Sequence, residues 1–458
     1  MDWKKQNVMV AGSGKSGIGA ANLLKKIGAS VVIYDGNDKL NREEILSKLE
    51  ISENVEVILG ALHDDTIEKI DLMILSPGIA IDTPFVNRVR EAGVPIWGEV
   101  ELAYVVAKGK LAAITGTNGK TTTTALVGEI LSAYFPHVDV VGNIGKPYTS
   151  TAFDTDENSV TVAEISSFQL ETIHTFKPDV SAVLNITPDH LNRHYTMECY
   201  TNVKMSITKN QDSSQPVILN YEDKVLREYA PKLHNKIIWF SSQRKLEQGI
   251  FLDGRNIIYK DEKEEKIITT TEDTNLVGIH NIENIMAAIG ITINMGVPAD
   301  IIREAIRKFK AVPHRIEYVD TVDDVIYYND SKGTNTDASI KAIQAMSRPT
   351  VLIAGGYDKK VSFDEFAKEF HGKIKCLVLL GQTAQQIADT VKKYGFENII
   401  FTNSLEEAVV ECRKAASPGD AVLLSPACAS WGMFDNYEQR GDRFKELVYN
   451  LSNSSAMR

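Results

Sequence analysis

The chain has 458 residues, 43% hydrophobic and 24% charged, and a formal net charge of −11 from 50 basic and 61 acidic residues. At roughly 150 residues per domain, this length predicts about three domains. The composition allows sizeable cores and excludes wholesale disorder. The acidic balance argues against a protein that coats nucleic acid or an anionic membrane, so a phosphate ligand would need cations concentrated locally.

The cysteines and the N-terminus indicate the cellular compartment. The cysteines are scattered, with no CxxC pair and no zinc-type cluster, at Cys199, Cys376, Cys412 and Cys428. In a chain of this length they are typical of reduced thiols. The apolar run before Gly12 is too short for a signal-peptide core, and no stretch approaches a membrane span. We therefore expect a soluble, cytoplasmic monomer with no nucleic-acid or membrane partner.

Short apolar runs rich in Val and Ile alternate with helix-like stretches almost throughout the chain. Strand–helix–strand repetition predicts an α/β fold with parallel sheets covered on both faces. Glycine loops near residues 12 and 116, and polar signatures near residue 313, mark restarts that place domains at 1–98, 99–311 and 312–458. The stretch Ile250–Thr271 alternates apolar and polar residues, which predicts a small antiparallel sheet with the charged run 261–266 as a solvated turn.

The first glycine loop, Gly12–Gly17 (GSGKSG), follows the apolar run Val8–Ala11, and Asp35 ends the next apolar run. In the dinucleotide fingerprint, this order lets backbone N–H groups approach a pyrophosphate at a helix N-terminus. A lone GxGxxG motif is a weak indication, because the same glycines also serve a tight turn and helix packing. We favour nucleotide diphosphate binding over NAD chemistry, because nothing downstream supplies an obvious hydride-transfer site. A second turn, Ser76–Gly78 (SPG), is expected to face the same crevice.

The second glycine loop, Gly116–Thr122 (GTNGKTT), follows the apolar run Leu111–Thr115 and opens a helix. It has the mechanics of a P-loop: amides cradle phosphates, Lys120 reaches the β- and γ-phosphates, and Thr121 offers a hydroxyl to Mg²⁺. The match is partial, since Ile114 stands where the first glycine is usual. A glycine-rich turn with a solvent lysine explains neither the preceding strand nor the Lys-Thr pair. The loop therefore predicts ATP binding.

Polar residues after the next two apolar runs extend this site. Glu164 ends the run that starts at Val160, and a carboxylate at the carboxyl end of a parallel strand points into the ligand crevice, so we expect it to bind metal. His190 occupies a similar position beside Asp189, although a lone histidine is more often structural. From the sequence alone, Lys204 is an ordinary solvated lysine on the helix that follows.

These motifs resemble those of the ATP-dependent Mur ligases of peptidoglycan synthesis, in the same order over essentially the whole chain. The matching stretches are Gly116–Thr121, Glu164–Leu170 (EISSFQL), Asp189–His194 (DHLNRH), Gly278–Asn284 (GIHNIEN) and Pro313–Glu317 (PHRIE). Two stretches, Tyr328–Asn335 (YNDSKGTN) and Leu424–Trp431 (LSPACASW), resemble the branch that adds D-glutamate. At the stretch Tyr328–Asn335, other branches and the related folylpolyglutamate synthases usually have an Asp motif that contains His. Asn192 departs from the family, where Asp is common.

The resemblance implies a three-domain fold and a two-step reaction. An N-terminal Rossmann-like domain would bind the UDP-substrate, a central P-loop-type ATPase would bind ATP, and a C-terminal Rossmann-like domain would bind the amino acid and close on ATP. The carboxylate of UDP-N-acetylmuramoyl-L-alanine attacks the γ-phosphate of ATP, giving an acyl phosphate, and the amine of D-glutamate then displaces phosphate. The implied partners are these small-molecule substrates, and the implied cofactor is Mg²⁺, as two ions.

The resemblance also implies which residues bind each ligand. The UDP-substrate would contact Lys15, Ser16, Asp35, Ser76, Pro77, Gly78, Asn143, Ser166 and Gln169. ATP would contact Gly116, Thr117, Asn118, Gly119, Lys120, Thr121, Thr122, Asn284, Arg315 and Asp330. D-glutamate would contact Thr334, Lys359, Ser430 and Tyr437. One Mg²⁺ would be held by Thr121 and Glu164, and the other by His190 and a carbamylated Lys204; the implied catalytic residues are Lys120, Glu164, His190, Lys204 and Lys332.

Several assignments have rivals. Lys360 competes with Lys359 for a substrate carboxylate. Tyr437 is also explained by core packing. Asn281 and Asn284 are also explained by capping of a helix that starts at Asn284. At the level of function, the alternatives are a nicotinamide-dependent oxidoreductase built on the first glycine loop and a nucleotide-gated binding protein without turnover. A sister ligase that adds another amino acid is the nearest rival.

Overall fold

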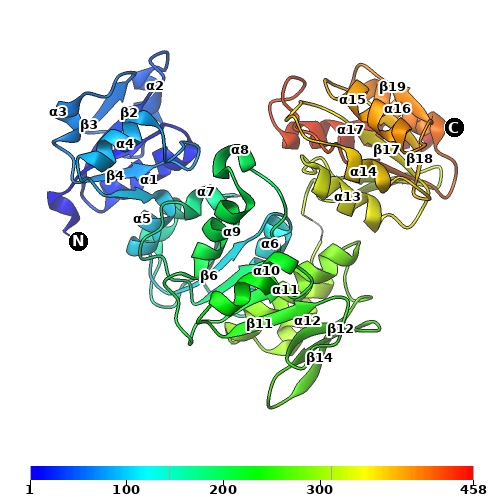
Figure 1. Cartoon of the computed structure of the whole chain (residues 1–458), viewed down its shortest axis with the longest axis horizontal. Helices are drawn as coiled ribbons and strands as arrows, with labels where there is room; N and C mark the ends of the chain where they lie inside the picture. The colour runs from blue at the N-terminus through cyan, green and yellow to red at the C-terminus, as the bar shows by residue number, and fades with distance from the viewer. Residues whose placement is uncertain (1, 144, 311, 457–458) are drawn as a thin grey trace. The chain divides into compact units, whose positions relative to one another are not determined.

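The computed structural model describes residues 2–143, 145–310 and 312–456 and contains three sheets (Figure 1). The chain forms two compact units, Met1–Asp273 with Glu283–Lys308, and Thr274–Ile282 with Phe309–Arg458. The first unit holds two of the sheets and the second unit holds the third. The fold is thus three-domain α/β, as predicted. The predicted boundaries themselves stay predictions, and residue 311 lies outside the described residues.

The N-terminal sheet has five parallel strands in the order β3-β2-β1-β4-β5. Its strands are β1 (Asn7–Ala11), β2 (Ser30–Asp35), β3 (Val55–Leu59), β4 (Leu72–Leu75) and β5 (Ile96–Gly98). Its helices are α1 (Lys15–Lys26), α2 (Arg42–Ser47), α3 (Asp64–Ile67) and α4 (Pro84–Glu91). The strand order reverses between β1 and β4, and ligands of open α/β sheets bind at the carboxyl ends of such a pair.

The middle sheet has nine strands in the order β14-β13-β12-β11-β10-β9-β6-β8-β7. They are β6 (Lys110–Thr115), β7 (Val138–Gly142), β8 (Val160–Glu164), β9 (Val180–Val183), β10 (Val217–Asn220), β11 (Ile237–Ser241), β12 (Gly249–Asp253), β13 (Asn256–Lys260) and β14 (Glu265–Thr270). The predicted antiparallel strands are present as β12–β14. They continue the parallel sheet instead of forming one of their own, because β12 pairs with β11 in parallel.

The helices of the middle region carry four of the ten predicted ATP-site residues. They are α5 (Glu99–Val106), α6 (Lys120–Ser132), α7 (Ser167–Leu170), α8 (Leu191–His194), α9 (Met197–Met205), α10 (Lys224–Tyr229), α11 (Ile279–Asn294) and α12 (Ala299–Lys308). Short 3-10 helices lie at Trp3–Lys5, Tyr148–Ser150, Ala152–Asp154, Ser206–Thr208 and Ala230–Lys232. Two of the longer helices (α6 and α11) are mostly buried, which fits their position against a nearly continuous apolar sheet.

The C-terminal sheet is mixed, with the order β15-β16-β20-β17-β18-β19, and only β15 and β16 pair antiparallel. Its strands are β15 (Glu317–Val322), β16 (Val325–Asn329), β17 (Thr350–Ala354), β18 (Ile374–Leu379), β19 (Ile399–Phe401) and β20 (Ala421–Leu424). Its helices are α13 (Thr336–Ala345), α14 (Asp364–Lys368), α15 (Ala384–Lys393), α16 (Leu405–Ala415) and α17 (Tyr437–Ala456). Successive residues of β17 enter two different apolar clusters, so both faces of this sheet are covered.

Two further observations bear on the predicted compartment. Within the described ranges, no helix has both the length and the apolar character needed to cross a membrane. The four cysteines are free thiols; Cys199 is exposed and the other three are buried. The thiols agree with a reducing environment, while the compartment itself stays a prediction.

Candidate active site

The loop between β6 and α6 is built to approach an anion. Gly119, the N-cap of α6, has a φ of 86°, and a Cβ there would lie 2.3 Å from Asn284 Oδ1. Asn185 braces the loop, since its carbonyl accepts the Thr117 N–H at 2.9 Å and its Oδ1 accepts the Asn118 N–H at 2.8 Å. The amino end of a helix presents N–H groups and a partial positive charge, which favours a phosphate.

Two lysine amines converge on one carbonyl of this loop. Lys120 Nζ donates to the carbonyl oxygens of Gly116 and Thr117, both at 2.9 Å. Lys204 Nζ donates to the same Gly116 oxygen at 2.9 Å. Lys204 is only 1% exposed, so its interpretation as a solvated lysine is wrong. Burial, reinforced by the charge of Lys120, holds the pKa of Lys204 well below its usual value.

Glu164 supplies a carboxylate at the end of β8. The side chain is 1% exposed, and Oε1 accepts a hydrogen bond from Asn143 Nδ2 at 2.9 Å. Oε2 is buried and has no hydrogen-bond partner among the described residues. A buried carboxylate oxygen without a partner is costly unless a cation or another ligand binds it. Together with the buried Thr121 in the first turn of α6, it fits a Mg²⁺ site.

The protein ligands available for metal are few. In the part of the chain that the structure describes, no group of three or more His, Cys, Asp or Glu side chains is placed to hold a metal ion. Mg²⁺ is commonly bound by one or two carboxylates together with substrate phosphates and water. The donor set around Glu164 therefore suits an ion that arrives with a nucleotide better than one held by the protein alone.

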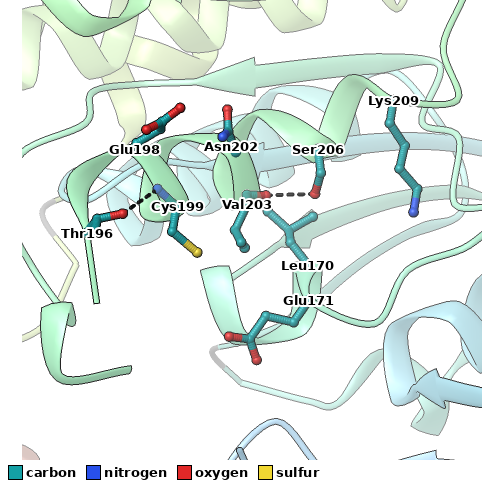
Figure 2. A pocket seen from close by; sticks show the side chains of 9 residues that line it. All are labelled: Leu170, Glu171, Thr196, Glu198, Cys199, Asn202, Val203, Ser206 and Lys209. Atoms are coloured by element: carbon teal, nitrogen blue, oxygen red, sulfur yellow. Dashed lines mark hydrogen bonds between the residues drawn. The ribbon is translucent and has the colours of Figure 1, made fainter. Parts of the chain in front are cut away.

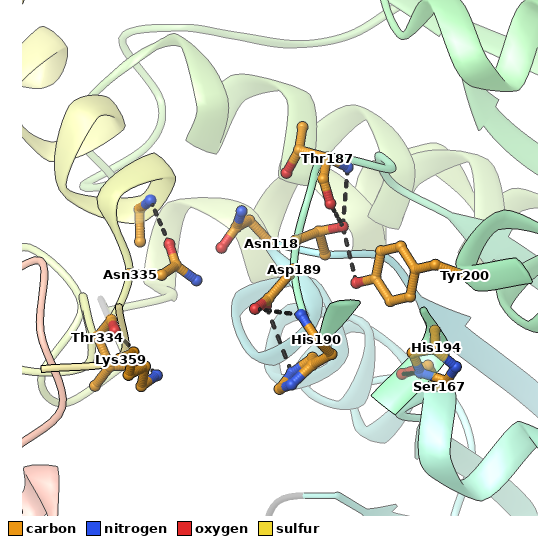
Figure 3. A network of polar contacts seen from close by, with 12 residues as sticks. Asn118, Ser167, Thr187, Asp189, His190, His194, Tyr200, Thr334, Asn335 and Lys359 are labelled. Atoms are coloured by element: carbon orange, nitrogen blue, oxygen red, sulfur yellow. Dashed lines mark hydrogen bonds and ion pairs between the residues drawn. The ribbon is translucent and has the colours of Figure 1, made fainter. Parts of the chain in front are cut away.

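The segment that carries His190 is tied to the phosphate loop. Thr117 Oγ1 accepts the Thr187 N–H at 3.0 Å and lies 3.1 Å from Tyr200 Oη (Figure 3). His190 itself is half-exposed, with Nε2 3.5 Å from Asp189 Oδ2. The structure therefore brings the predicted ATP loop, Glu164, His190 and Lys204 together within one unit.

Six of the nine predicted UDP-substrate residues line a separate cavity of about 480 Å³, whereas Asn143, Ser166 and Gln169 are not among its lining residues. The cavity is lined by the first glycine loop, Asp35, Ser76, Pro77, Gly78, Ile79 and Phe85. Gly17 has a packing role, because a Cβ there would lie 1.8 Å from the Gly12 carbonyl oxygen. Asp35 Oδ2 accepts hydrogen bonds from the N–H and hydroxyl of Ser13, which fixes the mouth of the loop. Lys15 Nζ donates to the Gly145 carbonyl at 2.6 Å.

A buried carboxylate that the sequence analysis missed holds one of the predicted substrate residues. Ser166 and Gln169 form a capping box at α7, and Gln169 Nε2 donates to Glu99 Oε1 at 2.7 Å. Burial raises the pKa of Glu99 to about 7, despite this hydrogen bond. The available signal was a glutamate in the otherwise apolar stretch Ile96–Ala103, where Glu101 is the other exception.

Asn284, which was predicted to contact ATP, and the nearby Asn281 lie inside a helix. Helix α11 begins at Ile279, so Asn281 and Asn284 cannot be caps of a helix that starts at Asn284, and that alternative is wrong. Asn281 Nδ2 donates to the Val277 carbonyl at 2.8 Å. Asn284 is buried, with Oδ1 accepting from Thr123 Oγ1 at 3.3 Å, directly against the phosphate loop.

In the second unit, Asp330 follows β16 and is buried. Its Oδ2 accepts the Ser425 hydroxyl at 2.7 Å and its Oδ1 accepts the Ile316 N–H at 3.3 Å. Burial raises the pKa of Asp330 to about 7, partly offset by that hydroxyl and by the charge of Arg315. The predicted ATP residues Arg315 and Asp330 are therefore electrostatic neighbours.

The predicted D-glutamate residues form two contacts in this unit. Lys359 Nζ donates to the Thr334 carbonyl at 3.2 Å (Figure 3). Lys332 Nζ lies 5.2 Å from the ring centre of Tyr437, which is half-buried and so is not a core residue. Lys359 and Lys360 are both exposed, and the choice between them stays open.

The sequence analysis also missed Arg440, which is buried on α17. Its guanidinium donates to the hydroxyl and carbonyl of Ser331 at 2.9 and 2.8 Å and to the Cys428 carbonyl at 3.3 Å. It therefore ties the loop after β16 to the loop after β20, and these two loops carry Lys332 and the buried Ser430. An arginine in a polar helix gives no sequence signal for such a role.

A second cavity, of about 490 Å³, lies along α9 (Figure 2). It is lined by Leu170 and Glu171 and by residues of α9 and the turn after it, including Cys199 and Lys209. Among the described residues that line this cavity, none was predicted to bind a ligand.

Three family models match the chain in succession: the Mur ligase MurD-like N-terminal domain at residues 6–98, the Mur ligase middle domain at 114–292 and the Mur ligase glutamate ligase domain at 314–428. A protein of Lachnospira eligens named UDP-N-acetylmuramoylalanine--D-glutamate ligase is 57% identical over 98% of this chain and 100% of its own length. The chain belongs to the Mur ligase family.

Other relatives agree. The proteins of the same name from Lachnoclostridium phytofermentans and Clostridioides difficile are 54% and 44% identical over 98% of this chain, and the matches cover 99% and 100% of those proteins. The crystal structure of UDP-N-acetylmuramate-alanine ligase MurC from Thermotoga maritima has a TM-score of 0.61 at 20% identity, covering 97% of this chain and 99% of its own. MurF ligase from the same organism, in complex with ADP, has a TM-score of 0.61 at 16% identity, covering 99% and 97%. These two structures show the shared fold.

The buried Glu99 predicts a specific dependence of stability on pH. The folded protein holds the Glu99 proton more tightly than the unfolded chain does, so the free energy of unfolding falls as pH rises from 4.5 to about 7. Glu99→Gln removes this titration, and with it a pH-dependent loss of up to about 3 kcal/mol in the free energy of unfolding across that interval. The melting midpoint of Glu99→Gln should therefore rise relative to that of wild type as pH rises from 4.5 to about 7.

The matched control is Glu129→Gln, on the exposed side of α6. Its melting midpoint should follow that of wild type across the same pH range. Parallel pH profiles for Glu99→Gln and wild type would mean that Glu99 is already ionised in the folded protein.

Proposed function

We propose that the protein is an ATP-dependent ligase that joins D-glutamate to UDP-N-acetylmuramoyl-L-alanine through an acyl phosphate, in cytoplasmic synthesis of peptidoglycan precursors. The observation that carries the proposal is the convergence of Lys120 and Lys204 on the Gly116 carbonyl. The unpartnered oxygen of Glu164 belongs to the same site, since its charge acts on Lys204. The branch is supported by relatives of that name that are 43–57% identical over nearly the whole chain.

The chemical problem of the first step is that two anions must meet. A carboxylate must approach the γ-phosphate in line, and cations lower the barrier by neutralising both groups and fixing their geometry. Lys120 is proposed to bind the β- and γ-phosphates, and Lys332 to neutralise the transferred phosphoryl group. Thr121 and Glu164 would hold one Mg²⁺, and His190 with Lys204 a second. Bound there, Mg²⁺ supplies positive charge to the phosphate oxygens.

Lys204 can hold a metal only if its amine is converted. An ammonium group is no ligand for Mg²⁺, whereas a carbamate, formed when the neutral amine adds CO₂ and releases a proton, offers oxygens that suit a hard ion. The amine is buried and donates to the carbonyl oxygen of Gly116, in the loop that is proposed to bind the nucleotide. The lowered pKa of Lys204, caused first by burial, favours the neutral amine that this addition needs.

The two outer sites would bind the substrates. The 480 Å³ cavity with Lys15, Ser16, Asp35 and the Ser76–Gly78 turn would take the UDP group, and Asn143, Ser166 and Gln169 the muramoyl-alanine end. Thr334, Lys359, Ser430 and Tyr437 would bind D-glutamate. Asn284 would bind adenine, and Arg315 and Asp330 would complete the ATP site when the C-terminal domain closes. We propose a monomer as the active form.

Amino-acid selectivity tests the proposed function. With UDP-N-acetylmuramoyl-L-alanine, Mg²⁺ and ATP, phosphate release should be strong with D-glutamate and near background with L-glutamate or L-lysine. The same assay without any amino acid gives the background of ATP hydrolysis. Release that is strongest with L-lysine, or equal for the two glutamate enantiomers, would instead place the protein in a sister branch.

Chemical rescue tests the proposed carbamate. Lys204→Ala should lose about a hundredfold or more in kcat, because the second metal loses an oxygen ligand. Short-chain carboxylic acids such as formate or acetate should restore part of that activity by supplying the missing oxygens. The control is Lys224→Ala, which removes an exposed lysine of α10. It should keep the wild-type kcat, and added carboxylic acids should not change that kcat. Full activity of Lys204→Ala without added acid would remove the basis for the carbamate.

A further inference from the structure

The four-residue helix α8 is flanked by two residues in an unfavourable backbone conformation. His190 before it has a φ of 53° and Tyr195 after it has a φ of 63°, and neither is glycine. L-residues adopt such angles at a cost, so they persist only where surrounding contacts hold the segment. Two side chains of this segment, Arg193 and Tyr195, make contacts of that kind.

Both side chains reach the loop that lines the UDP cavity. Arg193 Nη2 donates to the Ile79 carbonyl at 2.8 Å, and Ile79 is one of the cavity-lining residues that follow the Ser76–Gly78 turn. Tyr195 Oη donates to Asp82, three residues further along. Two hydrogen bonds therefore connect α8 and the residue after it to the loop 76–82.

Arg193 is locked in place by a buried carboxylate. Its Nε and Nη2 donate to the two oxygens of Glu171 at 3.2 and 2.5 Å, and the two side chains are only 12% and 4% exposed. Glu171 Oε1 also lies 3.5 Å from His194 Nδ1. Such a bidentate pair fixes the plane of the guanidinium, which a lysine cannot reproduce.

The same guanidinium acts on His190 through an aromatic ring. The guanidinium carbon of Arg193 lies 4.7 Å from the ring centre of Phe168, and the His190 ring packs edge-on against Phe168 at 4.9 Å between centres. Phe168 thus lies between the arginine and the proposed metal-binding histidine. A continuous set of contacts runs from Ile79 through Arg193 and Phe168 to His190.

We propose that Arg193 is a positioning residue that couples occupancy of the UDP cavity to the placement of His190 for metal. A UDP-substrate that orders the loop 76–82 favours the arrangement of Arg193 and Phe168 that holds the His190 ring. Linkage then requires that metal bound at His190 tighten the binding of the UDP-substrate by the same factor. This inference rests on the proposed function, because it requires both ligands.

The test measures Mn²⁺ binding by electron paramagnetic resonance, with a non-hydrolysable ATP analogue present and with or without UDP-N-acetylmuramoyl-L-alanine. In wild type, the UDP-substrate should tighten Mn²⁺ binding by about fivefold or more, the lower end of usual coupling. Arg193→Lys keeps the charge and loses the bidentate geometry, so this gain should fall below about twofold. A direct contact between substrate and metal contributes equally to both proteins and leaves the comparison valid.

Arg244→Lys is the matched control. Arg244 makes the same kind of bidentate pair with Glu222, at 3.0 and 2.8 Å, and stacks 5.2 Å from the Tyr221 ring centre. None of these three residues lines the UDP cavity or is a proposed metal ligand. It should keep the wild-type gain in Mn²⁺ affinity. Phe168→Leu provides a second variant in case Arg193→Lys folds poorly; it leaves the ion pair and should also lose the gain.

The outcomes separate this inference from the proposed function. Suppose that wild type forms the D-glutamate product, but Arg193→Lys or a folded Phe168→Leu shows the wild-type gain in Mn²⁺ affinity. Then the coupling role of Arg193 is overturned and the proposed function stands. If wild type forms no product with D-glutamate, the proposed function fails and the inference fails with it. A loss of the gain in both variants, with Arg244→Lys unchanged, supports the coupling.

Discussion

The carbonyl oxygen of Gly116 accepts hydrogen bonds from two lysine amines, Lys120 and Lys204, each at 2.9 Å. Burial, followed by repulsion from the charge of Lys120, lowers the pKa of Lys204 at this contact. The contact spans 88 residues, so it joins α9 to the phosphate loop. The chemistry proposed for Lys204 starts from this contact.

The acidic composition is compatible with phosphate chemistry because the cations are local. A net charge of −11 describes the whole surface, whereas Lys120 and Lys204 lie within one loop and the helix that packs on it. Glu164 adds a carboxylate whose buried oxygen is costly unless a cation or another ligand binds it. Excluding a nucleic-acid coat from bulk charge therefore did not exclude nucleotide binding.

Local signals in the sequence predicted the elements well and the long-range contacts poorly. The runs Val8–Ala11 and Leu111–Thr115 match β1 and β6 except for one residue at the start of each strand, because short apolar runs between turns have few other structures. The start of α11 was misplaced because asparagine is a common cap, while the actual break follows Gly278, which has a φ of 94°. The burial of Lys204 and the contact of Arg193 with Ile79 arise from residues 88 and 114 positions apart, which periodicity cannot show.

The central claim is that the substrate carboxylate is activated by phosphoryl transfer from ATP, and oxygen transfer tests it most directly. UDP-N-acetylmuramoyl-L-alanine labelled with ¹⁸O in both oxygens of its terminal carboxylate would be converted with ATP and D-glutamate, and the released phosphate analysed by mass spectrometry. The acyl-phosphate route predicts one ¹⁸O in each phosphate and one in each new amide. Unlabelled phosphate would contradict the account. So would the release of AMP and pyrophosphate with ¹⁸O in either product.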